Sequence, residues 1–275
     1  MLRLHIFHTG WASVQEKQLY VGGSTATRIL PVQAFVIEHP KGLVVFDTGL
    51  NASFAMRPRQ YIGWPGNSLP PFRSSPGMNL STQMRARGLL PEKVVCVVLS
   101  HLHYDHTGDL HAFPNAQCIV TRLEWRAAQS LLRRFKGYLD KGYSGLSFTL
   151  LDFPLYDGLV ANKAIKGNYG LDLMADGSLI LVPTFGHTQG HQSLLVFLPY
   201  GTVLLAGDAV YVREGYLRPA NQPYAHFPEN AWRTLIGIRA LAKGDPSVII
   251  LPTHDDSTLY GLRRPDIVMG DAHIT

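Results

Sequence analysis

One segment of the chain joins an apolar run to four polar side chains: Val94-Val-Cys-Val-Val-Leu-Ser-His-Leu-His-Tyr-Asp-His106. Its first six residues are apolar and mostly β-branched, which is typical of a buried strand. The polar residues His101, His103, Asp105 and His106 follow where the chain leaves the predicted sheet, a common location for functional groups on a rigid scaffold. Imidazole and carboxylate groups at this density suit zinc or another first-row divalent metal.

Three later segments repeat this arrangement, because each places a His or an Asp at or near the end of an apolar run. They are Gly186-His187-Thr-Gln-Gly-His191, Leu204-Leu-Ala-Gly-Asp208 and Ile249-Ile-Leu-Pro-Thr-His254-Asp255. A sheet that gathers sequence-distant ligands at one edge presents them in this way. The repetition therefore argues against the alternative, a polar loop that is rich in histidine by chance.

The four segments supply seven candidate metal ligands, more than one tetrahedral zinc ion accepts. Two ions about 3.5–4 Å apart, sharing a carboxylate and a water or hydroxide, would use them all. Because side chains alternate along an extended segment, we expect His101, His103 and Asp105 to point the same way. We expect His106 to point to the other side. One arrangement places His101, His103 and His187 on the first ion, Asp105, His106 and His254 on the second, and Asp208 between them.

Four nearby residues are candidates for supporting roles. Asp47 ends the apolar run Leu43-Val-Val-Phe46, and we expect it to hydrogen-bond the backbone or a ligand imidazole. His191 is interpreted as a supporting residue rather than a ligand. Tyr104 and Tyr211 are the aromatic residues nearest the ligands in sequence, and a phenol beside a metal can donate to a developing oxyanion. Tyr211 is the stronger candidate for this catalytic role.

Length and composition predict one domain over residues 1–275. The chain is 46% hydrophobic and 16% charged, which is typical of a folded protein with a substantial core. Its net charge is +5, but the basic residues are scattered, and the densest groups are the pairs Arg133-Arg134 and Arg263-Arg264. A nucleic-acid partner requires a clustered basic stripe, so none is expected. The charge favours mild attraction of anionic molecules.

The two cysteines, Cys96 and Cys118, lie in apolar runs without C-x-x-C spacing, so we expect reduced core residues. The first eight residues resemble no signal peptide, and no stretch approaches the roughly 20 apolar residues of a membrane span. We therefore expect a cytoplasmic protein without a membrane partner.

Local patterns predict most of the regular elements. They predict a hairpin of strands 31–38 and 43–46, a strand over 116–121, and helices over 80–87, 124–135 and 229–243. Residues 51–80 are predicted to form a long loop, and 136–178 give no clear pattern. Because the strands fall into two groups, each with helices, we expect two packed sheets with helices outside.

The ligand segments resemble those of the metallo-β-lactamase superfamily. The resemblance rests on Asp47-Thr-Gly, His101-x-His-x-Asp-His106, Gly186-His187, Gly207-Asp208 and His254, in that order. It implies an αββα sandwich of two mixed β-sheets with a dinuclear metal site at the sheet edges, within the α/β (α+β) class. Three details resemble the quorum-quenching N-acyl-homoserine lactonases: Ser-His-Leu-His-Tyr-Asp-His, Gly-His-Thr-x-Gly-His-Gln-Ser and Gly-Asp-Ala-x-Tyr.

The resemblance implies a dinuclear metal-dependent hydrolase that opens the lactone ring of N-acyl-homoserine lactones by attack of a metal-bridging hydroxide. Tyr211 would polarise the lactone carbonyl, and Asp105 would carry a proton to the leaving alkoxide. The cofactors would be two divalent metal ions. Zn²⁺ is the preferred candidate, and the same ligands also accept cobalt, manganese or iron. The partner would be a small-molecule lactone, and the resemblance suggests a homodimer.

Other functions remain open on the same ligands. Glyoxalase II-type thioesterases share the Gly-His-Thr-x-Gly-His segment, and an ester or phosphotriester hydrolase could use the same site. A nucleic-acid-processing member would explain the basic pI of about 9.2. A non-enzymatic binding module usually lacks a ligand, and none is missing here. The chain has no G-x-S-x-G elbow, P-loop or dinucleotide-binding motif.

Overall fold

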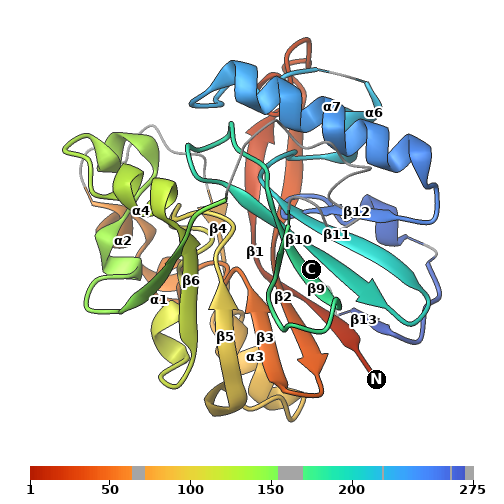
Figure 1. The fold of residues 1–275 in the computed structure, drawn as a ribbon. Coiled ribbons are helices and arrows are strands. Elements are labelled where there is room, and N and C mark those ends of the chain that lie inside the picture. The colour runs from red at the N-terminus through yellow and green to blue at the C-terminus, as the bar shows by residue number, and fades with distance from the viewer. Residues whose placement is uncertain (64–71, 154–169, 219, 261, 270–275) are drawn as a thin grey trace.

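The computed structural model describes residues 1–63, 72–153, 170–218, 220–260 and 262–269 of the chain. Within these ranges two β-sheets pack face to face, and helices cover their outer faces (Figure 1). This arrangement is the predicted αββα sandwich of two mixed sheets.

The first sheet has the strand order β13-β1-β2-β3-β5-β6-β7, with β4 also paired to β1. Its first half is an antiparallel meander of β1, β2 and β3, whereas β3, β5, β6 and β7 run parallel. The strands are β1 Arg3–Gln15, β2 Thr27–His39, β3 Gly42–Phe46, β4 Phe72–Arg73, β5 Val94–Val98, β6 Gln117–Thr121, β7 Phe148–Leu151 and β13 Ile267–Met269.

The second sheet has the order β12-β11-β10-β9-β8. Its strands are β8 Leu171–Asp172, β9 Leu179–Pro183, β10 Gln192–Leu198, β11 Gly201–Gly207 and β12 Ile249–Pro252. Strands β11 and β12 run parallel, so their carboxyl ends meet at the same edge of the sheet. This edge carries two of the candidate ligands.

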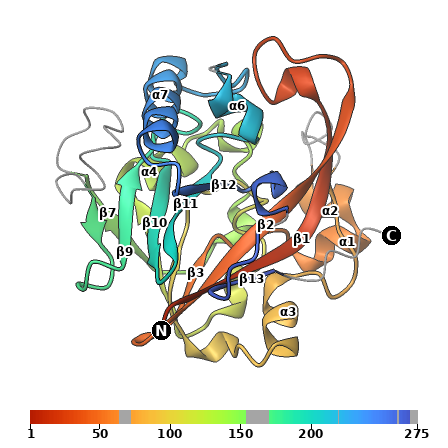
Figure 2. The same cartoon turned by 90° about the vertical axis from the view of Figure 1, so that its right-hand side faces the viewer.

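The described helices are short except for the last. They are α1 Ala52–Met56, α2 Pro58–Ile62, α3 Leu80–Ala86, α4 Arg122–Ala128, α6 Arg213–Leu217 and α7 Pro228–Gly244, with 3-10 turns at Glu16–Gln18, Pro91–Lys93, Leu110–Ala112, Arg133–Lys136, Asp140–Gly142 and Ser257–Leu259. Helix α7 lies against the second sheet, and α3 lies against the first (Figure 2).

The core follows from the alternation of side chains along the strands. Between the sheets, Phe35 and Phe46 of the first sheet pack in one cluster with Leu194 of the second. On the opposite face of β2, Val36 packs in a cluster with Met84 of α3. Because both faces of the central strands are buried, these strands appear in the sequence as continuous apolar runs.

Several predicted elements are confirmed. The hairpin of β2 and β3 turns at residues 40–41, α3 covers most of the predicted helix 80–87, and α7 contains all of 229–243. Apolar residues of α7 recur at helical spacing, with Leu235, Ile238 and Leu241 buried against the second sheet. Both cysteines are buried and unpaired, as expected.

Other predictions were wrong. The predicted helix 124–135 ends early: α4 stops at Ala128, and a separate 3-10 turn begins at Arg133. The predicted loop 51–80 contains α1, α2 and β4, although residues 64–71 lie outside the described ranges. The unassigned segment 136–178 contributes β7 and β8, and its residues 154–169 are likewise not described.

Strand β1 had no counterpart in the sequence analysis, although it spans 13 residues and pairs with β2 along its whole length. Its histidines interrupt the apolar pattern, and its pairing shifts register between His8 and Gly10. Among the described residues, no helix has the length and apolar character needed to cross a bilayer.

Candidate metal centre

The predicted ligands lie at the ends of four strands. The segment His101–His106 follows β5, and His187 lies in the loop between β9 and β10. Asp208 follows β11 directly, and His254 follows β12. The sandwich thus brings residues separated by up to 153 positions to one edge, as the strand-end pattern predicted.

The seven side chains form two groups, and within each group the potential ligand atoms lie within 4.8 Å of one another. The first group contains His101, His103 and His187, and the second contains Asp105, His106, Asp208 and His254. All are buried except His103, which has intermediate exposure. Two compact sets of this kind suit two metal ions rather than one.

The expected alternation of side chains along residues 101–106 was only partly right. His101 and His103 do converge, but the chain turns after His103, whose carbonyl accepts a hydrogen bond from the His106 amide at 3.0 Å. This turn carries Asp105 away from the first group. Its Oδ2 lies 3.5 Å from His106 Nε2 and 3.5 Å from His254 Nε2.

Asp208 lies between the two groups, with one carboxylate oxygen facing each. Its Oδ1 is 3.4 Å from His106 Nε2 and 3.4 Å from His254 Nε2. Its Oδ2 is 3.6 Å from His187 Nε2 and 4.0 Å from His101 Nε2. A carboxylate in this position can bridge two cations.

The ligand atoms within each group are arranged to bind a metal ion rather than to form hydrogen bonds with one another. His187 Nε2 lies 3.2 Å from both His101 Nε2 and His103 Nδ1, so three ring nitrogens converge on one point. The second group contains two buried atoms without a hydrogen-bond partner, His106 Nε2 and Asp208 Oδ1. Buried polar atoms normally have a hydrogen-bond partner, and an ion bound within the second group would interact with both of these atoms.

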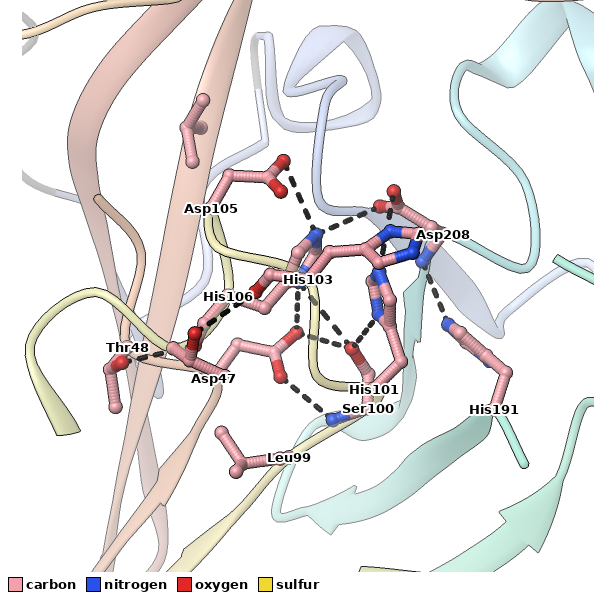
Figure 3. A network of polar contacts seen from close by, with 12 residues as sticks. Asp47, Thr48, Leu99, Ser100, His101, His103, Asp105, His106, His191 and Asp208 are labelled. Atoms are coloured by element: carbon pink, nitrogen blue, oxygen red, sulfur yellow. Dashed lines mark hydrogen bonds and ion pairs between the residues drawn. The ribbon is translucent and has the colours of Figure 1, made fainter. Parts of the chain in front are cut away.

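The opposite ring nitrogen of four candidate ligands has a partner of its own, a pattern typical of metal-bound histidine. His106 Nδ1 bonds Asp47 Oδ2 at 2.8 Å, and His101 Nδ1 lies 2.9 Å from Ser100 Oγ (Figure 3). His254 Nδ1 lies 2.9 Å from the Pro31 carbonyl oxygen. His187 Nδ1 lies 3.1 Å from Tyr211 Oη.

Asp47 links these supports, as the sequence analysis predicted. Its carboxylate also accepts hydrogen bonds from the Ser100 amide and hydroxyl, both at 2.7 Å (Figure 3). Asp47 adopts a left-handed backbone conformation with φ of 56°, which is costly for a residue other than glycine. Its hydrogen bonds to the ligand segment hold it there.

His191 supports Asp208 and belongs to neither ligand group, in agreement with its predicted role. Its Nε2 accepts a hydrogen bond from the Asp208 amide at 3.0 Å (Figure 3). Its Nδ1 lies 2.8 Å from Thr184 Oγ1. Gly207 allows this approach, because a Cβ there would lie 2.8 Å from His191 Nε2.

The two groups differ in their electrostatics. Burial lowers the pKa of His101 and His187 well below its usual range, and that of His103 to about 3. Burial also acts on His254, but the carboxylates of Asp208 and Asp105 outweigh it and raise this pKa to about 10. The first group is therefore neutral and keeps its lone pairs, as metal ligands must.

A cavity of about 410 Å³ opens beside both groups. One wall is apolar and comes from β1, β2, β4 and the turn that follows β1. It contains Ala12, Val14, Leu19, Leu30 and Phe72. The candidate ligands His103, Asp105, His187, Asp208 and His254 line the cavity as well. A small molecule with an apolar portion can therefore lie with its polar end against the ligands.

The two candidate tyrosines occupy different positions beside this cavity. Both line it, and Tyr211 Oη reaches His187. Tyr104 packs in an aromatic cluster with Phe54 and Phe72, and its buried hydroxyl has no hydrogen-bond partner. Burial raises the pKa of both phenols well above the usual value, so both stay protonated at neutral pH.

The structure places one further histidine, His226, beside the site, although no feature of the sequence marks it as a site residue. Its ring lies 5.8 Å from the His103 ring and 6.3 Å from the His187 ring, and it lines the cavity. Its amide donates to the His187 carbonyl at 3.1 Å. No strand end or motif marks His226 in the sequence, so only the folded loop could reveal it.

The other non-ligand histidines of the described chain lie outside both groups. His5 bonds Glu38 at 2.7 Å, His39 bonds Asp176 at 2.9 Å, and His8 lies 3.5 Å from Asp256. His111 lies 3.3 Å from the Lys141 carbonyl oxygen. His273 lies outside the described residues.

The sequence matches known proteins over nearly its whole length. Residues 27–271 match the family described as the metallo-beta-lactamase superfamily. The N-acyl homoserine lactonase AttM of Azorhizobium caulinodans is 32% identical over 247 residues, covering 88% of this chain and 89% of that protein. AttM of Agrobacterium fabrum is 30% identical over 269 residues, covering 96% of this chain and 98% of that protein.

Solved structures show the same fold at lower sequence identity. An N-acyl homoserine lactone hydrolase with the product N-hexanoyl-L-homoserine at its catalytic metal centre gives a TM-score of 0.78 at 22% identity, covering 95% of this chain and 96% of that one. AidC, a dizinc quorum-quenching lactonase, gives a TM-score of 0.62 at 14% identity, covering 93% of this chain and 88% of that one.

Proposed function

The chain belongs to the metallo-β-lactamase superfamily, and we propose that it is a metal-dependent hydrolase that opens the lactone ring of N-acyl homoserine lactones. The observation that carries this proposal is the position of Asp208 between two ligand groups, beside a cavity with an apolar wall. The related lactonases named above support the choice of substrate.

Two divalent ions, zinc by preference, are assigned to the two groups. His101, His103 and His187 would hold one, Asp105, His106 and His254 would hold the other, and Asp208 would contact both. When bound, two such ions would lower the pKa of a water between them and polarise the lactone carbonyl. The absence of a thiolate and the open cavity favour this catalytic use over a closed structural site.

Tyr211 is assigned to the carbonyl oxygen of the substrate. If His187 Nε2 faces a metal ion, the ring proton is on Nδ1, and the Nδ1–H group donates a hydrogen bond to Tyr211 Oη. The Tyr211 hydroxyl proton is then free to be donated to an acceptor in the cavity. Because the pKa of Tyr211 is raised by burial, that proton is present at neutral pH.

Asp105 is assigned to proton transfer. Its Oδ2 faces His106 and His254, and the residue also lines the cavity. The second carboxylate oxygen can take a proton from the attacking water and deliver it to the alkoxide that leaves when the ring opens. The facing imidazoles outweigh the effect of burial and hold the pKa of Asp105 below its usual range, so the group starts as a carboxylate.

The apolar wall is assigned to the acyl chain. Leu30 and Phe72 lie on this wall, and Phe72 is also close to a candidate ligand, its ring lying 6.4 Å from that of His254. An acyl chain that runs along the wall therefore ends near the metal groups. Each methylene removed from water on this surface contributes about 0.8 kcal/mol.

The direct test measures acid release from short- and long-chain N-acyl homoserine lactones, by metal-loaded and chelator-treated protein in parallel. We expect ring opening by the loaded protein only, and restoration when metal is returned. A thioester and a simple ester are assayed beside the lactones. Rapid thioester hydrolysis without lactone turnover would replace the lactonase by a thioesterase that uses the same groups.

A further inference from the structure

Glu124 is a fully buried carboxylate that the proposed reaction does not use. Within the described part of the chain it forms no ion pair, although burying an unpaired carboxylate is costly. Burial raises the pKa of Glu124 above its usual range, while the hydrogen bonds that it accepts oppose this rise. A residue that bears such a cost without a charged partner is expected to have a specific role.

The local sequence predicts that Glu124 caps a helix, but in the structure its carboxylate bonds other segments. Thr121-Arg-Leu-Glu124 has the spacing of a capping box, in which the glutamate bonds the N-cap amide at the start of a helix. Thr121 does cap α4, because its side chain accepts a hydrogen bond from the Glu124 amide at 3.1 Å. The Glu124 carboxylate instead bonds two other segments.

These two segments are the loops that carry the first ligand group. Glu124 Oε1 accepts a hydrogen bond from the amide of Leu102, which lies between His101 and His103, at 3.1 Å. Glu124 Oε2 accepts one from the amide of Gly190, three residues after His187, at 3.1 Å. One carboxylate thereby ties together two loops whose bonded residues, Leu102 and Gly190, are 88 positions apart in the chain.

The Gly190 loop packs tightly against the first turn of α4. The Gly190 carbonyl accepts a hydrogen bond from the Thr121 hydroxyl at 2.7 Å, so both backbone groups of this residue are held. A Cβ at Gly190 would lie 2.2 Å from the Glu124 amide nitrogen, which is too close for any side chain. The position of the loop is therefore set by α4.

We propose that Glu124 is a positioning residue that sets the separation between His187 and the pair His101 and His103. The inference rests on the proposed metal centre. His187 is the only member of the first group that comes from the β9–β10 loop. The second group has separate supports in Asp47, His191 and the Pro31 carbonyl, none of which involves Glu124.

The test compares Glu124→Gln and Glu124→Ala with wild type. The amide of glutamine keeps the shape of glutamate but accepts through one oxygen only, so one of the two loops loses its bond. We expect one of the two metal ions to bind about 10- to 100-fold more weakly in a chelator competition, the range found for residues that orient metal ligands. The second ion should bind with the wild-type affinity.

Asp266→Asn is the control, because Asp266 is also a buried carboxylate that accepts a backbone hydrogen bond, from the Tyr200 amide at 3.1 Å, although it also pairs with Arg264 at 2.7 Å. It lies outside both ligand groups. If Asp266→Asn weakens metal binding as much as Glu124→Gln does, the effect reflects general destabilisation and the inference fails.

Amide hydrogen exchange of the metal-free protein tests the same inference independently of metal binding. We expect the Leu102 and Gly190 amides to exchange at least 10-fold faster in Glu124→Ala, with the Ser100 amide, held by Asp47, unchanged. Unchanged exchange at both positions would overturn the inference. If wild type binds no metal, the proposed centre is wrong, whereas the exchange result still decides whether Glu124 holds the two loops.

Discussion

The two halves of the candidate metal centre consist of similar residues but differ in charge balance. His101, His103 and His187 face one another as neutral imidazoles, because burial and their mutual proximity lower their pKa values. His106 and His254 instead face the carboxylates of Asp105 and Asp208, which raise the pKa values of both imidazoles despite their burial.

This difference shows which half depends more on a bound cation. The second group can balance its carboxylates with protonated imidazoles when no metal is present. The first group has no such internal compensation, since its three converging nitrogens repel one another when protonated. Its geometry must therefore be held from outside, by Tyr211 at His187, by Ser100 at His101 and, as we propose, by Glu124.

Asp208→Ala should produce the largest effect, because the Asp208 carboxylate faces both halves, with one oxygen toward each. We expect loss of metal from both groups and a fall in kcat/KM of more than about 100-fold, beyond the range typical of residues that only orient ligands. Mass spectrometry measures the loss of metal, and the rate of lactone hydrolysis measures the fall in kcat/KM. Asp176→Ala, on an exposed turn, is the control. Retention of two tightly bound ions would remove Asp208 from its bridging position.

Tyr211→Phe separates catalysis from support of the first half. We expect kcat to fall about 10- to 100-fold while KM changes little and both ions are retained, because a hydrogen bond to the developing oxyanion is lost. Metal titration beside steady-state kinetics distinguishes the alternatives. Loss of one ion would instead assign Tyr211 to the orientation of His187, with which it shares a 3.1 Å contact.

The metal-free protein should respond to pH in opposite directions through its two halves. The pKa of His103 falls from 6.5 to about 3 on folding, so the folded state loses stability as the pH drops from 6.5 towards 3. The pKa of His254 rises from 6.5 to about 10, so its contribution is lost as the pH rises from 6.5 through 10.

Urea unfolding of metal-free protein between pH 4 and 10 measures both slopes. We expect His103→Gln to reduce the pH dependence of the unfolding free energy on the acid side, and His254→Gln to reduce it on the alkaline side. Each change should amount to about 1–2 kcal/mol. The full pKa shifts, at about 1.36 kcal/mol for each pKa unit, would give more, but solvent in the cavity weakens the effect. If neither substitution alters its own side of the profile, the assigned charge difference between the halves is wrong.

The smallest effect is expected at the rim of the cavity beside the first half. Phe135 lines the cavity but is 65% exposed, so its truncation should leave the core intact. We expect Phe135→Ala to raise KM about 3- to 5-fold for long-chain lactones only, through loss of apolar contact. Phe135→Leu, which keeps an apolar side chain, should bring the KM for long-chain lactones most of the way back to the wild-type value. Equal effects on short chains would place the acyl group elsewhere.

Much of the centre was predictable because its signals are local. An apolar run followed by His or Asp identifies a strand end and a ligand together, and this pattern found all seven residues that the structure gathers. Two packed sheets with helices outside followed from the two groups of strands, and the αββα sandwich from the family resemblance. Strand β1 escaped prediction because its histidines and register shift obscure the alternation on which strand assignment depends.

The extent of α4 and the roles of Glu124 and His226 could not be predicted in the same way. Thr121-Arg-Leu-Glu124 has the pattern of a helix cap, and nothing nearby indicates that the carboxylate bonds two distant loops. His226 enters the cavity through a loop whose position depends on its backbone contact with His187. Contacts between segments far apart in the chain leave no local periodicity to detect.

The sequence shows which residue types are available as ligands, places them at strand ends of a layered α/β protein, and allows one division of them between two ions. The folded chain groups the side chains according to that division: the turn after His103 carries Asp105 to the second group, and Asp208 lies between the two groups. The distances between the ligand atoms, however, are not contained in any local pattern. Strand formation depends on neighbours in the chain, whereas the separation of ligand atoms depends on how two sheets pack and on the hydrogen bonds that tie their loops together.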